Sequence, residues 1–178
     1  MAFLAASIGL AKFASAAVLD CGAADSAYVF VRPGGANGLG HVGWGYRTSC
    51  DGGYSFGSVE NPNGSPILSA GSDNGFWRQD GGEADMLTAM KARGYLSYKA
   101  ITVSTASFDA SPANTVAAAA AGRGYAVLGN NCADVVWDVL KAYGVPDLPY
   151  LQVHPIPNDW YGNLRQTRKV TWSASTSL

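Results

Sequence analysis

The clearest hydrophobic pattern in the chain runs from Cys132 to Tyr143. Apolar side chains recur there near the 3.6-residue period of one helix face, at Ala133, Val136, Trp137, Leu140 and Tyr143. Gly144 and Pro146 follow, and such residues commonly end a helix. The pattern predicts an amphipathic helix that begins at Cys132. Similar reasoning predicts helices over residues 83–92 and 111–121.

Other segments carry strand patterns, and turn residues separate them. We expect strands over residues 28–32, 41–46, 54–60 and 95–103, with shorter ones at 124–128 and 169–172. The Asp51-Gly52-Gly53 turn joins two of these strands into a hairpin. Residues 61–82 are predicted to be mostly loop, a length that is unusual unless the loop serves a site. The fold class is therefore α+β, a small antiparallel sheet with helices on one side.

Composition narrows the function without naming it. The length of 178 residues indicates a single domain, and a hydrophobic content of 48% excludes a mainly disordered chain. The net charge is −1 and the 12 basic residues are dispersed, so we expect no nucleic-acid binding through a basic patch. No apolar run approaches the roughly 20 residues of a membrane-spanning helix.

The N-terminal segment and two cysteines suggest an exported protein. Residues 1–20 form either a packed N-terminal helix or a processed segment, because Ala14-Ser15-Ala16 has signal-peptidase spacing. Cys21 and Cys50 lie in glycine-rich surroundings, where they could form a disulfide or remain unpaired. The low charge and this possible bridge favour a secreted or exported protein. The chain could also be part of a larger polypeptide, such as a toxin or effector.

Cys132 stands where a loop turns into the predicted helix. Unpaired backbone N–H groups at a helix start carry partial positive charge, which favours a thiolate over a thiol. The same groups can hold the oxyanion of a tetrahedral intermediate. Asn130 or Asn131 would cap the helix and could add a side-chain donor. The alternative is a buried structural cysteine, a common fate for this residue.

A cysteine nucleophile needs a base, and the chain has two histidines. His41 begins a predicted strand after a glycine-rich loop. His154 follows Cys132 by 22 residues, and the helix carries the chain about 18 Å away at 1.5 Å per residue. We therefore expect His41 to be the base and His154 to be a surface loop residue. The alternative for His41 is a hydrogen-bonded histidine at a strand end.

A third group should orient the imidazole. If Tyr46 pairs with Tyr54 across the hairpin, His41 lies opposite Val59, and a shift of one residue places Glu60 there instead. Because register decides which side chain faces the ring, Glu60 is the first candidate and Asn61 the second. As an alternative, Glu60 is a solvated residue at the end of a strand.

Three stretches together resemble the circularly permuted papain-like superfamily, which includes permuted NlpC-type peptidases, lecithin:retinol acyltransferase-like proteins and PPPDE peptidases. The stretches are residues 41–46, residues 54–60, and the Tyr-x-x-x-x-Asn-Asn-Cys-Ala-Asp sequence that opens residues 125–144. In those families the histidine precedes the cysteine, as His41 precedes Cys132 here.

The resemblance implies a papain-like fold and a hydrolase or acyltransferase with an acyl-cysteine intermediate. Cys132 would be the nucleophile, His41 the base, and Glu60 or Asn61 the third polar group. We expect hydrolysis of an amide in a peptide or cell-wall peptide, without a cofactor or metal. One alternative is a lipid or thioester acyl hydrolase or acyltransferase, which exposed apolar residues near Trp77 or in 145–160 would favour. Another is a non-catalytic module whose tryptophans bind sugar or peptide.

Overall fold

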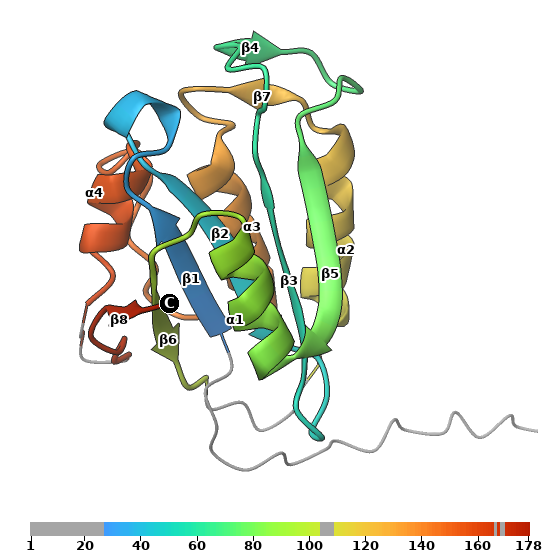
Figure 1. Ribbon diagram of the computed structural model, residues 1–178, viewed down its shortest axis with the longest axis vertical. Coiled ribbons are helices and arrows are strands. Elements are labelled where there is room, and N and C mark those ends of the chain that lie inside the picture. Colours follow the sequence, from blue (N-terminus) through green and yellow to red (C-terminus); the bar gives the residue numbers. More distant parts are fainter. Residues whose placement is uncertain (1–26, 104–108, 166, 168–169) are drawn as a thin grey trace, which may run out of the picture.

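A six-stranded antiparallel sheet forms the centre of the computed structural model, which describes residues 27–103, 109–165, 167 and 170–178 (Figure 1). The strand order is β5-β3-β2-β1-β6-β8, and a separate two-stranded ribbon pairs β4 with β7. The strands are β1 (Ala27–Arg32), β2 (His41–Arg47), β3 (Gly53–Val59), β4 (Ile67–Leu68), β5 (Phe76–Gly82), β6 (Ser97–Ile101), β7 (Tyr125–Ala126) and β8 (Thr176–Ser177).

Helices cover both faces of this sheet. In Figure 1, α1 (Glu83–Ala92) lies in front of the strands, and α2 (Ser111–Ala119) and α3 (Cys132–Tyr143) lie behind them. The short α4 (Pro157–Gly162) packs on β1 and β2 from the α3 side. Two 3₁₀ turns, Ala36–Gly38 and Ala120–Gly122, complete the elements. The α+β class is therefore correct, whereas the expectation of helices on one side only is wrong.

Alternation along β2 separates two hydrophobic cores. Val42, Trp44 and Tyr46 are buried in the core beneath α2, α3 and α4. On the opposite face, Gly43 and Gly45 leave room for side chains of α1: a Cβ at Gly43 would lie 3.2 Å from the Met90 Cε, and one at Gly45 would collide with the Met86 Sδ. The small residues between large ones thus let α1 approach the centre of the sheet.

The hairpin of β2 and β3 has the shifted register. Arg47 pairs with Tyr54 and Tyr46 pairs with Ser55, so the simple pairing of Tyr46 with Tyr54 is wrong by one residue. The paired ladder ends at Trp44 and Gly57, and the same register extended by three residues brings His41 opposite Glu60, where their side chains meet at 3.1 Å. His41, at the start of β2, and Glu60, directly after β3, therefore lie next to each other on one face of the sheet.

The segment of residues 61–82 differs from the prediction of a loop. Its second part is β5, an edge strand that pairs with β3 along its whole length. The amide of Asn74 fixes the approach to β5, because it donates to the carbonyls of Ala120 at 2.8 Å and Gly124 at 3.0 Å. Because these hydrogen bonds join residues far apart in the sequence, they produce no hydrophobic periodicity from which the strand could be predicted.

Two shorter predictions also need correction. The described residues of 169–172 are not strand, and the last strand is β8. Of residues 124–128, only Tyr125–Ala126 pair, with β4. Both segments are held by tertiary packing, as Val170 and Trp172 are buried in the core.

Residues 1–20 and Cys21 lie outside the described residues. Cys50 is engaged in a disulfide and Cys132 is a free, buried thiol. None of the helices built by the described residues is long and apolar enough to cross a membrane.

Candidate active site

The start of α3 holds Cys132 as the first helical residue. Asn131 is the N-cap: its side-chain oxygen accepts from the backbone N–H of Ala133 at 2.7 Å and of Asp134 at 3.4 Å. The Asp134 carboxylate accepts from the Asn131 N–H in return at 2.8 Å, completing a capping box. These bonds place Cys132, which is 2% exposed, at the positive end of the helix.

The side-chain amides of Asn130 and Asn131, which were candidate donors to an oxyanion, already donate to backbone carbonyls. The Asn131 amide donates to the carbonyls of Val127 at 2.8 Å and Pro155 at 3.3 Å. Asn130 is bound to Arg123 through both its side-chain oxygen and its amide nitrogen. By contrast, no recorded hydrogen bond between described residues uses the Cys132 backbone N–H. This N–H, rather than an asparagine side chain, is the donor available beside the thiol.

His41 lies at the start of β2 with its ring buried. Its Nε2 is 2.9 Å from the Ser58 Oγ and 3.1 Å from the Glu60 Oε2. The ring of Tyr95 packs against it with centroids 5.7 Å apart. Cys132 lies near enough to His41 to raise the pKa of the imidazole, and Nδ1 is the ring nitrogen that Ser58 and Glu60 do not engage.

The Ser58 hydroxyl determines which nitrogen carries the proton. It donates to the Val42 carbonyl at 3.2 Å, and a hydroxyl has a single proton to donate. Ser58 must therefore accept the Nε2–H of His41, as does the Glu60 carboxylate. Neutral His41 then has a bare Nδ1, the acceptor that a general base needs toward a thiol.

Four donors hold Glu60. Its Oε2 accepts from Arg32 Nη2 at 2.9 Å as well as from His41. Its Oε1 accepts from Trp77 Nε1 at 2.8 Å and from Tyr95 Oη at 3.2 Å. These contacts fix a mostly buried carboxylate in one position beside the imidazole, so Glu60 is not the solvated strand end of the alternative interpretation.

The positive charge of His41 and the negative charge of Glu60 stabilise each other. Burial alone would lower the pKa of His41, but the charge and hydrogen bond of Cys132 and then those of Glu60 raise it to about 9. Burial alone would raise the pKa of Glu60, but its bonds and charge interactions with His41, Trp77 and Arg32 lower it to about 2. At neutral pH the imidazole is therefore protonated and the carboxylate is ionised.

A cleft of about 730 Å³ opens over the cluster, within the usual range for small-molecule sites. His41, Glu60 and Asn131 line it, and so does Tyr125, whose pKa rises to about 12 through burial and the charge of Cys132. Asn61 also lines the cleft, but its amide donates to the Ser65 carbonyl at 2.9 Å. Glu60, rather than Asn61, contacts the imidazole.

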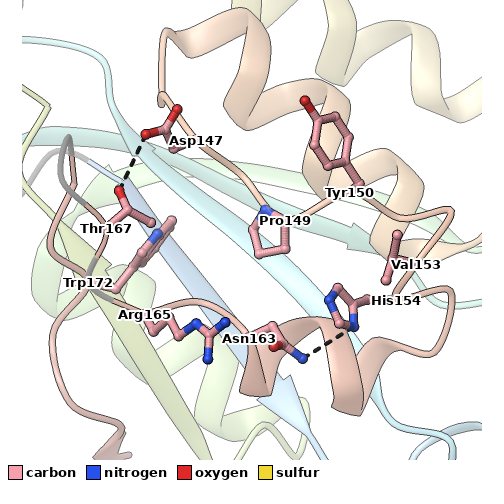
Figure 2. Close-up of a pocket in the computed structure, with 9 residues that line it drawn as sticks. All are labelled: Asp147, Pro149, Tyr150, Val153, His154, Asn163, Arg165, Thr167 and Trp172. Atoms are coloured by element: carbon pink, nitrogen blue, oxygen red, sulfur yellow. Dashed lines mark hydrogen bonds between the residues drawn. The ribbon is translucent and has the colours of Figure 1, made fainter.

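His154 lies in a different place. It lines a separate cavity of about 280 Å³, where its Nδ1 is 3.3 Å from the Asn163 amide (Figure 2). The same nitrogen is 2.6 Å from the Asp159 carboxylate. No cysteine lines that cavity, and the buried Cys132 does not itself line the cleft at His41, where its neighbour Asn131 does. Only His41 joins a carboxylate and a thiol. Among the described residues, no group of three His, Cys, Asp or Glu side chains could hold a metal ion.

No family model matches the chain, and no curated protein or solved structure matches it either. The likeness to the papain-like superfamily therefore depends on the sequence motifs alone.

Sequence reasoning missed Ser58, Arg32, Trp77 and Tyr95, which hold His41 and Glu60 from three strands and a loop. Ser58 had a signal: it is two residues before Glu60, and side chains two apart on a strand share a face. For the others the signal would be the pairing of distant strands, which no local pattern contains.

We predict that Ser58→Ala lowers the pKa of His41, weakening its hold on the proton about tenfold. The change removes one of two acceptors of a buried, charged N–H, and such hydrogen bonds contribute about 1.5–3 kcal/mol. The measurement is the pH titration of the His41 imidazole by NMR, whose midpoint should move to lower pH. Ser55→Ala is the matched control, because Ser55 is equally buried on β3 but bonds Arg78. Equal shifts in both variants would contradict a specific role for Ser58.

Proposed function

We propose that this protein is a thiol-dependent hydrolase that cleaves an amide through an acyl-cysteine intermediate. One observation carries the proposal: a free cysteine at a capped helix start lies beside an imidazole whose Nε2 is held by a carboxylate. Nucleophile, base and orienting group in contact are the arrangement of covalent acyl transfer. A structural cysteine has no need of an ionised Glu60 behind its histidine.

In the proposed reaction, the Cys132 sulfur attacks the amide carbon and the carbonyl electrons move to oxygen. The Cys132 backbone N–H donates to this oxyanion. As the oxyanion collapses, the C–N bond breaks and the imidazolium of His41 gives its Nδ1 proton to the leaving amine. His41 then takes a proton from water, whose oxygen attacks the thioester. The carboxylic acid leaves, and the thiolate and imidazolium are restored.

A second candidate changes the leaving group from an amine to an alcohol or thiol. Exposed apolar residues in 145–160 favour a lipid or thioester substrate, and Tyr150, Val153 and Ile156 are 71%, 69% and 40% exposed there. The binding-module alternative has less support, because Trp44, Trp160 and Trp172 are buried in the core and cannot stack on a ligand.

Alkylation of Cys132 by iodoacetamide tests the proposal. We expect fast reaction at pH 6.5, where an ordinary thiol of pKa about 8.5 is only about 1% thiolate. His41→Ala should slow the reaction at this pH about 100-fold, because the proton acceptor for the thiol is lost. Mass spectrometry identifies the alkylated cysteine.

The matched control is His154→Ala, which removes the other histidine together with its Asp159 contact. This variant should react like the native protein. If Cys132 is inert in the native protein, or if both variants behave alike, the catalytic proposal fails.

A further inference from the structure

We infer that the acyl group transferred to Cys132 is an uncharged aliphatic chain. The inference rests on the proposed function and specifies the part of the substrate that the bond type leaves open. Three observations support it: the apolar side chains that line the cleft at His41, the hydrogen bonds that join these segments to Asn131 beside Cys132, and the pairing of the charged residues in the cleft.

Exposed apolar side chains gather at this cleft. Eight large apolar residues of the described chain are exposed, and four of them line it: Leu39, Val127, Leu128 and Ile156. Pro62, Pro155 and Pro157 add further apolar surface. Because exposed apolar residues scattered singly are normal but a gathered set marks a binding site, this cleft is suited to hydrocarbon.

The apolar walls are tied directly to the catalytic helix. The amide of Asn131, next to Cys132, donates to the carbonyls of Val127 and Pro155 and so joins two walls at the nucleophile. The third wall is joined through Asn158, whose backbone N–H donates to the Leu39 carbonyl at 3.1 Å. Cys132 itself is buried, but the adjacent Asn131 lines the cleft, so we place the chain of an acyl group carried on Cys132 between these walls.

The charged residues that line the cleft are paired with one another, since both Arg32 and His41 are bound to Glu60. Arg32 and Glu60 are the charged residues that line it besides His41. The Arg32 guanidinium is bound to Glu60 at 2.9 Å and to the Arg93 carbonyl at 2.9 Å. An acidic acyl group, such as one from a carboxylate-rich cell-wall peptide, would lose hydration there without gaining a partner. The cell-wall substrate is accordingly disfavoured relative to an aliphatic acyl group.

The test uses the full chain and two parallel substrate series, 4-nitroanilides and 4-nitrophenyl esters of acetic, butyric, hexanoic and octanoic acids. We expect kcat/KM, corrected for the uncatalysed rate, to rise about threefold per methylene, as expected for burial of hydrocarbon. The octanedioic monoester and monoanilide have the same chain length with a terminal carboxylate. They should react at least about 100-fold more slowly than the octanoyl compounds.

Leu128→Ser tests the wall itself. Leu128 is 72% exposed, so its replacement should leave the fold intact, and the rise with chain length should become shallower. Leu96→Ser is the matched control, because Leu96 is 62% exposed and does not line the cleft.

The possible failures are distinguishable. Rates independent of chain length, or faster with the terminal carboxylate, would overturn the aliphatic inference while the hydrolase proposal stands. Fast alkylation of Cys132 without turnover of any octanoyl compound would also overturn the inference. Slow alkylation without turnover would instead remove the proposed function on which it rests.

Discussion

Cys132→Ala is expected to abolish turnover and the acyl-enzyme intermediate together. The proposed reaction forms its covalent bond on the Cys132 sulfur, and removal of a nucleophile from such a site typically costs at least about 10⁴-fold in rate. Alanine keeps the helix start intact, because the cap depends on Asn131 and Asp134 rather than on the thiol. The measurement is kcat/KM on the octanoyl substrates together with the intact mass of the protein during turnover.

Cys132→Ser separates thiol chemistry from simple packing. Serine conserves the volume of the buried side chain, but its hydroxyl does not ionise near neutral pH. We expect the serine variant to be nearly as inactive as the alanine variant, with thermal stability close to that of the native protein. If the alanine variant retains turnover, the chemistry does not pass through Cys132, whatever the geometry at this helix start.

The hydrophobic pattern predicted α3 well because all its signals are local. The apolar stripe, the asparagine before Cys132 and the glycine at 144 lie within one short segment, and the helix has the predicted bounds. Asn131 caps it as one of the two candidates. Local signals do not predict the partners of the asparagine side chains. The amides of Asn130 and Asn131 donate to backbone carbonyls that no sequence pattern indicates.

Register shows where sequence reasoning reaches its limit. The hairpin between β2 and β3 was predictable, but its turn differs by one residue from the simplest pairing, and one residue decides whether Glu60 meets His41. The edge strand β5 was missed because its seven residues contain only two large apolar side chains. Its position depends on Asn74 and on pairing with β3, and so does the place of Trp77 against Glu60.

Glu60→Gln should give the largest electrostatic effect at the site, reducing kcat/KM at least about 100-fold. The native carboxylate accepts four hydrogen bonds, whereas an amide must present an NH₂ group to at least one of these donors. Both contributions of Glu60 to the raised pKa of His41 are lost. Arg32, left without its partner, further disfavours the imidazolium. The upper limb of the pH profile should therefore fall below about 9, although the larger contribution of Cys132 to the pKa of His41 remains.

Stability against pH provides a second measurement on this variant. Glu60 has a lowered pKa, so its contribution to native stability is present above about 4.5 and is lost as pH falls toward 2. His41 has a raised pKa, so its contribution is complete below about 6.5 and is lost as pH rises through about 9. The variant should lose the dependence at acid pH and weaken the one at alkaline pH, where Cys132 still raises the pKa of His41, together with about 3–5 kcal/mol of unfolding free energy from a broken buried pair.

Two further variants keep this prediction testable if Glu60→Gln folds poorly. Glu83→Gln is the matched control, because Glu83 also accepts a bond from a buried tyrosine, Tyr28, but does not contact His41. The double change of Arg32→Gln with Glu60→Gln removes both charges and should recover part of the stability but not the raised pKa of His41. If the upper limb of the pH profile stays near 9 in the folded double variant, Glu60 does not hold the proton on His41. The orienting role assigned to it would then be wrong.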